Sequence, residues 1–433
     1  MDYKKAQAYL DSLSFRGMKL GLANTSALLS ALGDPHLAVK TVHVGGTNGK
    51  GSTSAMVASI VSLAGIKCGL YVSPHLQTFR ERISVDGEMI TKPQAARLVG
   101  RVKEAAEKMA DPVTYFEFMT AMAFLHFAEE KVGLAVMEVG MGGRFDSTNV
   151  TTPEVTVITS VAMDHRQHLG GSLEKIAAEK CGIIKPGAPV VTAVRQPHVV
   201  GVALAAAEGR RAPVSLLGRD FHCRRTGFFE GGERFYFRSG ATVFKEATVS
   251  LVGRQQILNA SMAIQVALLL RERGYRIDDR SIIAALGSIS CPGRFEMVSE
   301  KPAIILDGAH NPRACSVLRE TLLERFGAGR VDFVFGAMAD KEFKRMIRNL
   351  LPVAASFTFF SPSVPRAADP QIFQRALKNS GAKVPSRVIG PVDELMGWIG
   401  SRKPERVILV TGSFYTVGEI RAKLSGGKVE DRA

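Results

Sequence analysis

The chain has 433 residues, of which 46% are hydrophobic and 22% charged, and its formal net charge is +15 at pH 7. This length and composition provide for two or three compact units with buried cores. No apolar run is long enough to cross a bilayer, and the start of the chain lacks the apolar core of a signal peptide, so we expect a cytoplasmic protein that spans no membrane. The positive charge suits nucleic acid, an acidic membrane surface or a polyanionic small molecule, but no basic tract or aromatic-rich motif favours the first two.

The first predicted element is a helix, or a pair of helices, that ends before Gly33 and Pro35. We expect this segment to dock on the domain that follows and to take no part in chemistry. Its apolar pattern consists of Leu20, Leu22, Leu28, Leu29 and Leu32.

The most informative stretch runs from Val42 to Thr53 and reads V-H-V-G-G-T-N-G-K-G-S-T. Apolar alternation before the glycines predicts a strand, and apolar residues from Met56 to Ala64 recur at helical spacing. A glycine-rich turn between a strand and a helix N-terminus binds polyphosphate, because glycines admit a close approach to the backbone N–H groups and the helix dipole favours anions. The alternative is a turn without a ligand. The predicted nucleotide-phosphate site consists of Gly46, Thr47, Asn48, Gly49, Lys50, Gly51, Ser52 and Thr53.

The glycine-rich loop departs from the ordinary P-loop in two places. Val44 stands where a glycine is expected, and the insertion of Gly51 delays the hydroxyl of Ser52 by one residue. This variant, G-T-N-G-K-G-S, resembles the ATP loop of the Mur ligase superfamily and, within it, of the dihydrofolate synthase and folylpolyglutamate synthase family.

Polar residues follow the next predicted strand, Cys68–Val72, in the segments S-P-H-L and F-R-E-R-I. Ligands meet parallel sheets at the carboxyl ends of strands, so we expect Ser73 to reach a metal ion and Arg80 and Arg82 to hold a carboxylate. The alternative is a solvated loop. The family resemblance implies that this segment, which includes His75, links a magnesium site to a folate site.

A carboxylate ends the predicted buried strand Leu134–Val139, where Glu138 needs a partner or a metal ion. The loop that follows, G-M-G-G-R-F-D-S-T-N, resembles a further motif of the family. The apolar segment Thr114–Phe127 before it is predicted to be a core helix, in which Glu117 and Thr120 share a face.

A third candidate for metal binding follows the predicted strand Val155–Ser160, in the sequence M-D-H-R-Q-H-L-G. A single histidine at such a place is often structural. However, Ser52, Ser73, Glu138 and His165 together form an oxygen-rich set with one nitrogen and no thiolate, which predicts Mg²⁺ or Mn²⁺ rather than structural zinc.

Lys180 lies near the end of a helix predicted over residues 172–180, which stops at Gly182. On chemistry alone we interpret Lys180 as a surface salt-bridge lysine. The resemblance implies instead that Lys180 is carbamylated and holds a second metal ion, with Lys185 as the alternative. Lys180 then joins Lys50 and His165 as the expected catalytic residues.

The composition changes at about residues 216–252, where short alternating runs around glycine pairs predict antiparallel hairpins. We interpret them as a small β appendage without chemistry. Gly253 then opens a long apolar helix through Leu270, on which Gln256 and Asn259 share a face. The resemblance places Asn259 against the nucleotide; the alternative is a polar first turn of the helix.

The remainder of the chain alternates strands and helices, which predicts a second doubly wound domain. Its first strand ends in D-G-A-H-N-P, where Asp307 can hold ribose hydroxyls and His310 can lie on the nucleotide. The alternative is a capping aspartate and a structural histidine. In C-P-G-R-F-E, the resemblance brings Arg294 to the ATP phosphates, although Cys291 replaces the usual tryptophan of the family. The expected strands are 303–306, 331–335, 356–360, 387–389 and 407–410.

These elements predict an α/β protein of two domains. Residues 1–292 form a P-loop ATPase-like doubly wound domain that carries the β appendage, and residues 293–433 form a Rossmann-like α/β domain.

The predicted chemistry requires no covalent nucleophile, and the chain has no G-x-S-x-G elbow. Lys50, Arg294 and metal ions favour attack of a carboxylate on the γ-phosphate of ATP, after which an amine captures the acyl phosphate. The resemblance supplies the substrates: L-glutamate is joined to dihydropteroate or to a reduced folate, with Mg²⁺, ATP and release of ADP and phosphate. It also implies a monomer that binds no nucleic acid.

Two alternatives to this function stay open. A muramyl-peptide ligase shares the ATP loop and the domain plan, although S-P-H-L, R-E-R-I and D-G-A-H-N-P fit the folate branch better. A basic nucleic-acid-binding NTPase is the alternative from a different class of protein.

Overall fold

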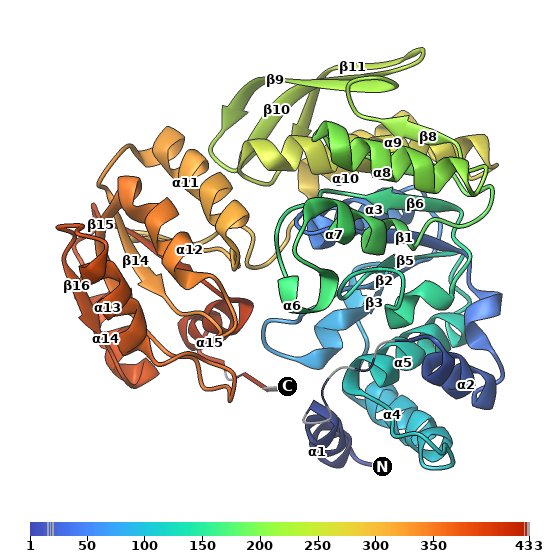
Figure 1. Cartoon of the computed structure of the whole chain (residues 1–433), viewed down its shortest axis with the longest axis horizontal. Coiled ribbons are helices and arrows are strands. Elements are labelled where there is room, and N and C mark those ends of the chain that lie inside the picture. The colour runs from blue at the N-terminus through green and yellow to red at the C-terminus, as the bar shows by residue number, and fades with distance from the viewer. Residues whose placement is uncertain (15–16, 18, 20, 428, 431–433) are drawn as a thin grey trace.

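The computed structural model describes residues 1–14, 17, 19, 21–427 and 429–430. Two lobes are each built on a largely parallel sheet, and a small three-stranded sheet lies beside them (Figure 1). This arrangement confirms the predicted α/β class. None of the helices within the described ranges is long and apolar enough to span a membrane.

The larger sheet has eight strands in the order β4-β3-β2-β5-β1-β6-β7-β8. Strands β2, β5, β1, β6, β7 and β8 are parallel, whereas β3 and β4 form an antiparallel edge. The strands are β1 (Thr41–Gly45), β2 (Cys68–Tyr71), β3 (Ile83–Val85), β4 (Glu88–Met89), β5 (Leu134–Glu138), β6 (Val155–Ile158), β7 (Val190–Thr192) and β8 (Val214–Leu216).

Helices cover both faces of this sheet because its central strands are apolar on both sides (Figure 1). Val42 and Val136 face the core under α3 (Lys50–Leu63), α9 (Arg254–Glu272) and α10 (Asp279–Ser288). On the opposite face, Ala135 and Met137 pack in the core formed with α1 (Tyr3–Ser14), α2 (Ala23–Ala31), α4 (Lys92–Ala106) and α5 (Tyr115–Glu129). The helices α6 (Arg166–Leu169), α7 (Leu173–Cys181) and α8 (Pro197–Glu208) belong to a third apolar cluster beside β6 and β7.

Side-chain caps fix several predicted helix ends. Thr114 forms a capping box with Glu117 at the start of α5, and Ser172 caps α7, which ends at Gly182 as predicted. Glu117 also accepts a hydrogen bond from Asn24 Nδ2 at 2.9 Å, so α2 and α5 are joined through a buried carboxylate. Leu20, part of the predicted N-terminal pattern, lies outside the described residues.

The predicted antiparallel hairpins form a sheet of β9 (Phe221–Phe229), β10 (Gly232–Ser239) and β11 (Thr242–Val249) in the order β11-β10-β9. Phe235 and Phe237 turn their side chains into the same core as α9. This small sheet is therefore continuous with the packing of the first lobe.

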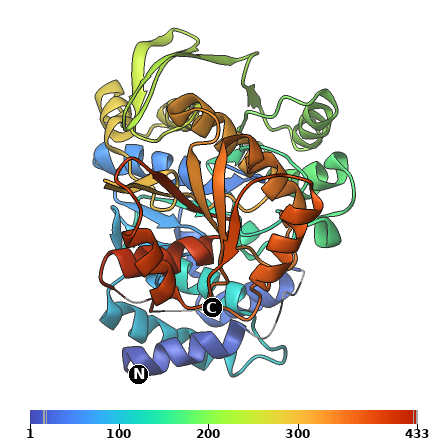
Figure 2. The ribbon, with the colours of Figure 1, turned by 90° about the vertical axis from the view of Figure 1, so that its left-hand side faces the viewer.

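The second lobe contains a six-stranded sheet in the order β12-β13-β17-β14-β15-β16, in which only β12 is antiparallel. Figure 2 faces this lobe, in which the strands lie between two groups of helices. The strands are β12 (Glu296–Glu300), β13 (Ala303–Leu306), β14 (Val331–Phe335), β15 (Ala354–Phe359), β16 (Ser386–Val388) and β17 (Val407–Thr411). The helices are α11 (Pro312–Phe326), α12 (Phe343–Leu350), α13 (Pro370–Asn379), α14 (Val392–Gly400) and α15 (Phe414–Leu424).

After α15 the chain returns to the first lobe, where Glu430 lies beside residues near the start of the chain. Figure 1 shows α15 facing the first lobe. The backbone N–H of Glu430 donates to the carbonyl of Gln77 at 2.8 Å. Its carboxylate pairs with Lys92 at 2.8 Å and accepts a hydrogen bond from Tyr3 at 3.2 Å.

A buried ion cluster joins the small sheet to the second lobe. Glu233 of β10 is fully buried and pairs with Arg225 at 2.6 Å and with Arg325 of α11 at 3.1 Å. It also accepts the backbone N–H of Gly253 at 2.9 Å. The charge of Glu233 therefore holds two arginines and the start of α9 together.

We expect Glu233→Gln to lower the free energy of unfolding by about 2–4 kcal/mol, because Arg325 loses its buried anion and Arg225 is left with Glu324 alone. Urea denaturation measures the effect. The matched control is Glu246→Gln, at an exposed position of β11. Equal losses of unfolding free energy for the two variants would show that the buried cluster contributes no more to stability than an exposed glutamate does.

Candidate active site

The strand order brings four predicted segments to one edge of the larger sheet. In the order β2-β5-β1-β6, Ser73 follows β2, Glu138 ends β5, the glycine-rich loop follows β1, and His165 lies beyond β6. Because these strands are parallel, their carboxyl ends meet at the same edge.

The glycine-rich loop (residues 45–52) is held tightly between neighbouring segments. The carbonyl of Asn48 accepts hydrogen bonds from the hydroxyls of Thr159 and Ser160, both at 2.8 Å. Gly49, with φ +89°, caps α3, whose first residue is Lys50. The free N–H groups at the start of α3 and the ammonium of Lys50 thus belong to one turn, which is the arrangement expected for binding phosphate.

Asn259 of α9 packs against this turn from the other side. A β-carbon at Gly49 would lie only 2.5 Å from Asn259 Oδ1. The amide of Asn259 also donates to Gln256 at 2.9 Å. Farther into α3, Ser52 is buried and Thr53 is completely buried.

Glu138 and Arg294 meet at Gly51. A β-carbon at Gly51 would lie 3.5 Å from Glu138 Oε2 and 3.6 Å from Arg294 Nη2. The Arg294 guanidinium is stacked 4.5 Å from the ring centre of Phe414, in the second lobe. Arg294, which follows α10 at the junction of the lobes, therefore places its positive charge beside the glycine-rich loop.

Glu138 is suited to hold a cation. The carboxylate is 2% exposed, and Oε2 accepts the N–H of Ser73 at 2.9 Å, while Oε1 accepts no hydrogen bond within the described part of the chain. Burial raises the pKa of Glu138 above its ordinary value, and the charge of Lys50 opposes this rise. The described residues contain no cluster of three or more His, Cys, Asp and Glu side chains that could form a metal site. A Mg²⁺ ion at Glu138 would therefore take its other ligands from hydroxyls, from phosphate oxygens and water, and from no more than a single imidazole.

Lys180 is not a surface residue, so its interpretation as a surface salt-bridge lysine is wrong. Its side chain is buried and donates from Nζ to the carbonyl of Gly46 at 2.9 Å. Burial and the positive charge of Lys50 lower the pKa of Lys180 from 10.5 to about 7. A substantial fraction of this amine is therefore neutral and nucleophilic near neutral pH. Lys185 instead donates to the carbonyl of Asn149 at 2.8 Å.

His165 lies at the start of α6 in a left-handed conformation, with φ +48°. Burial lowers the pKa of His165 to about 4, although the charge of Asp164 opposes this shift. The imidazole is consequently neutral at pH 7, the form that can bind a metal ion.

The second lobe reaches the glycine-rich loop through residues to which the sequence analysis gave no role. Asn311 donates to Asn48 Oδ1 at 2.9 Å and to Asp164 at 3.1 Å, and Lys341 pairs with Asp164 at 3.1 Å. Burial raises the pKa of Asp164, but the nearby His165, Lys341 and His310 outweigh it and hold this pKa well below its ordinary value. Asn311 and Lys341 follow the ends of β13 and β14, and this position after a strand is the feature of the sequence that could have indicated their role.

Asp307 and His310 lie beside this contact. Both oxygens of Asp307 accept backbone N–H groups, from Ala309 at 2.9 Å and from Phe295 at 3.0 Å. The ring of His310 packs against Phe414, with centroids 5.8 Å apart, and its Nδ1 lies 2.9 Å from the carbonyl of Gly308. Asp307 therefore orders the loop that follows Arg294.

The predicted substrate residues fall into two groups: Arg82 and His75 contact one another, whereas Arg80 does not share this contact. Arg82 is buried, donates to His75 Nδ1 at 2.8 Å and lies 5.1 Å from the ring centre of Tyr115. Burial and the charge of Arg82 lower the pKa of His75 well below its ordinary value. In contrast, Arg80 donates to the carbonyl of Ile90 at 3.2 Å.

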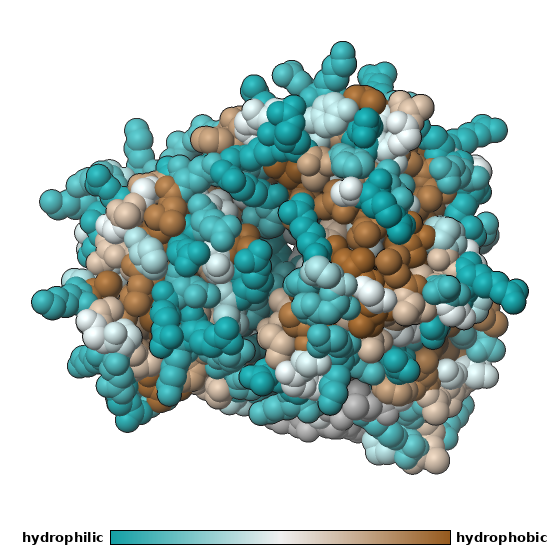
Figure 3. Space-filling model, turned by 45° about the horizontal axis from the view of Figure 1, so that its top comes forward, coloured by the Kyte–Doolittle hydropathy of each residue, from teal (hydrophilic) through white to brown (hydrophobic). Residues whose placement is uncertain are grey.

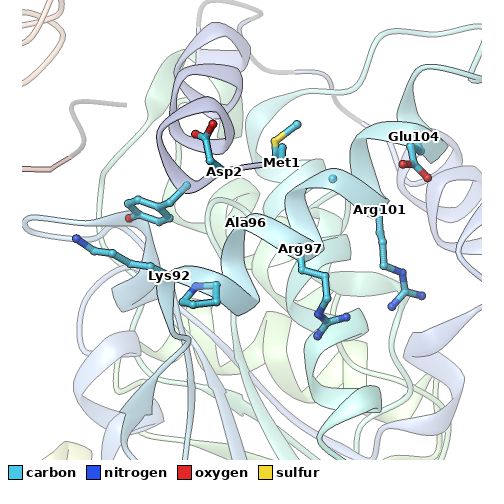
Figure 4. A pocket seen from close by; sticks show the side chains of 10 residues that line it. Met1, Asp2, Lys92, Ala96, Arg97, Arg101 and Glu104 are labelled. Carbon is cyan, nitrogen blue, oxygen red and sulfur yellow. The ribbon is translucent and has the colours of Figure 1, made fainter.

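The surface around the site is polar. Figure 3 shows hydrophilic side chains along the hollow between the two lobes. A pocket lies away from this hollow, between the start of α1 and α4 (Figure 4). Its cations Arg97 and Arg101 share the single carboxylate of Glu129.

Comparisons with known proteins define first the class of protein. Residues 44–267 match the Mur ligase middle domain, and residues 293–414 match the glutamate ligase domain of the Mur ligases. The fold, the glycine-rich loop and these two matches identify a Mur-type ligase.

Individual relatives define the family within this class. The chain is 38% identical to the dihydrofolate synthase/folylpolyglutamate synthase of Bacillus subtilis, over 98% of this chain and 99% of that protein. The Mycobacterium tuberculosis folylpolyglutamate synthase complexed with ADP superposes with a TM-score of 0.90 at 30% identity, covering 98% of this chain and 99% of that one. An Escherichia coli structure in complex with DHPP and ADP has a TM-score of 0.87 at 29% identity, covering 98% of both chains. The chain belongs to the dihydrofolate synthase/folylpolyglutamate synthase family, which confirms the predicted membership.

We expect Gly49→Ala to weaken nucleotide binding at least about tenfold, because the new β-carbon meets Asn259 and the backbone has positive φ. The control Gly65→Ala carries a similar φ of +79° but meets no neighbouring atom within 4 Å. Calorimetric titration with ADP compares the two. Equal affinities would contradict a tight contact between α9 and the loop.

We expect the stability that Lys180 contributes to depend on pH. Its pKa is about 7 in the folded protein and 10.5 ordinarily, so between these values the unfolded chain binds more protons than the folded one. Stability relative to Lys180→Met should therefore rise as the pH increases from about 7 to about 10.5, and stay level below that window. Denaturation in CO₂-free buffer at a series of pH values measures this difference in stability. The control is Lys108→Met, at an exposed position. A difference that does not vary with pH would contradict the buried neutral amine.

Proposed function

We propose that this chain is an ATP-dependent ligase that joins L-glutamate to dihydropteroate and to the γ-carboxylate of reduced folates, through an acyl phosphate, with release of ADP and phosphate. The observation that carries the proposal is the meeting of Glu138, Arg294 and the glycine-rich loop at Gly51. The names of the relatives support the choice of substrates: the Bacillus subtilis protein is both a dihydrofolate synthase and a folylpolyglutamate synthase. They favour the folate branch over a muramyl-peptide ligase.

The proposed chemistry depends on positioning and charge. The N-terminus of α3, Lys50 and Arg294 surround the place where the γ-phosphate would lie, so they neutralise it while a substrate carboxylate attacks the phosphorus. The bond to the β-phosphate oxygen breaks and ADP leaves. The amine of glutamate then attacks the acyl carbon, loses a proton and releases phosphate, which leaves an amide.

Metal ions fit the same place. Glu138, with one oxygen that accepts no hydrogen bond from described residues, would hold Mg²⁺ together with Ser52, Ser73 and His165. When bound, the ion would supply positive charge at the phosphate oxygens. Asn259, Asp307 and His310 would lie toward the nucleoside.

Lys180 would hold a second cation after carbamylation. The neutral amine attacks the carbon of CO₂ and loses a proton, which gives a carbamate anion. The lowered pKa of Lys180, caused by burial and Lys50, favours this reaction at neutral pH, and the charge of Lys50 would stabilise the anion. Because a carbamate binds no proton near neutral pH, whereas the amine of the unfolded chain is protonated below about 10.5, bicarbonate should extend the rise of stability with pH to values below about 7.

The organic substrate would approach from the other side of Glu138. Ser73 connects Glu138 to the segment that carries His75, Arg80 and Arg82. The buried guanidinium of Arg82 offers a site for a carboxylate or a polar ring edge.

ADP release across a panel of acceptors tests the proposal. We expect ADP to form when dihydropteroate or tetrahydrofolate is supplied together with glutamate and Mg²⁺. Glu138→Gln should lower kcat by about a hundredfold or more, because the site loses the charge that holds a cation. Glu117→Gln is the matched control, since Glu117 is equally buried but lies in the core beside Asn24.

Other outcomes of the same assay identify the alternatives. ADP formation that is indifferent to both acceptors and to glutamate would refute the proposed substrates. Stimulation by a UDP-muramyl peptide would favour the muramyl-peptide ligase. Stimulation by oligonucleotides, with steeply salt-dependent binding, would favour a nucleic-acid-dependent NTPase.

A further inference from the structure

Leu76 belongs to the first lobe by sequence, but its side chain is buried in the second. It lies five residues beyond β2 and is 8% exposed. The other buried members of its apolar cluster that the structure describes all lie between Ile304 and Ile420. A leucine from one lobe therefore completes the core of the other.

The contact around Leu76 is close on two sides. A β-carbon at Gly293, in the connection between the lobes, would lie 3.3 Å from Leu76 Cδ2. A β-carbon at Gly418 of α15 would overlap the carbonyl oxygen of Leu76. Both glycines therefore leave room for this residue.

The backbone of Leu76 is also fixed to the turn that carries the substrate residues. The carboxylate of Glu81 accepts the N–H groups of Leu76 and Gln77 at 2.8 Å and that of Thr78 at 2.9 Å. Glu81 belongs to the short 3₁₀ helix Phe79–Arg82, whose last residue donates to His75. A shift of Leu76 must move this turn.

The opposite end of the segment is bound to the catalytic edge of the sheet, because Ser73 donates its N–H to Glu138. Residues 73–82 thus contact the phosphate side through Ser73, the second lobe through Leu76 and the first lobe through Arg82. Three fixed points determine where His75 and Arg82 lie.

We propose that Leu76 is a positioning residue: its insertion into the second lobe sets the place of His75 and Arg82, so that the organic substrate is bound productively only when the lobes are docked. This inference rests on the proposed function. It assigns to the second lobe a part in recognising the acceptor, in addition to its contacts with the glycine-rich loop.

Kinetics of the full-length Leu76→Ala variant test this inference. We expect KM for dihydropteroate to rise about tenfold while the Kd of ADP changes less than about twofold, because the glycine-rich loop is not displaced. Leu76→Met, which conserves volume, should restore KM to within about threefold of the wild type. The control is Ile399→Ala, at a buried position of the same cluster on α14, which should lower Tm but leave KM unchanged.

A second variant, Gly418→Ala, tests the same contact between Leu76 and the second lobe if Leu76→Ala does not fold. Gly418→Ala pushes on the Leu76 carbonyl from α15 and should also raise KM for dihydropteroate selectively. Equal KM values for Leu76→Ala and Ile399→Ala, or a normal KM for Gly418→Ala with an intact fold, would overturn the inference.

Hydrogen exchange separates this inference from the proposed function. Amides 76–78, which Glu81 holds, should exchange faster in Leu76→Ala or Gly418→Ala than in Ile399→Ala, whether or not a folate is the substrate. Unchanged exchange would overturn the role of Leu76. Wild-type protein that is inactive with every pterin would instead refute the proposed function.

Discussion

The parallel pairing of β1 with β5 and β6 is the constraint on which the site depends. Val44 lies opposite Glu138 on one side, and Gly45 lies opposite Ile158 on the other. This register places the glycine-rich loop, the carboxylate of Glu138 and the segment that leads to His165 side by side at the same edge of the sheet. A shift by one residue would turn Glu138 to the opposite face of the sheet, away from Gly51. The backbone hydrogen bonds of three central strands therefore determine the chemistry.

Two cations of the protein converge on the glycine-rich loop. Lys50 begins α3 and Arg294 extends over Gly51, where Glu138 is the neighbouring anion. Like charges held close together are unfavourable unless an anion accompanies them. A polyphosphate between Lys50 and Arg294 would supply that anion, and such preorganised charge is the electrostatic basis of phosphoryl transfer.

Local patterns in the sequence were sufficient to predict the strand ends and the polar residues that follow them. The strands that end near Glu138 and Asp307, the helix capped by Ser172 and the hairpins of the small sheet all lie where their patterns indicated. Local sequence patterns could not predict that Lys180 is buried, because the burial of a residue at a helix end depends on which loop packs over that end. The short edge strands β3, β4 and β12 were missed, since strands of two to five residues show little alternation. The contacts of Leu76 and Lys341 join segments far apart in the chain, and no local signal reveals such partners.

The return of the chain end to the first lobe has a consequence for motion between the lobes. Glu430, beyond α15, contacts Gln77, Tyr3 and Lys92, so the second lobe is attached to the first through this residue as well as through the connection near Gly293. Two attachment points define an axis, and they favour rotation of one lobe about it over simple separation. A movement of the second lobe that keeps the contacts of Glu430 with Gln77 and Lys92 would therefore be a rotation of limited amplitude.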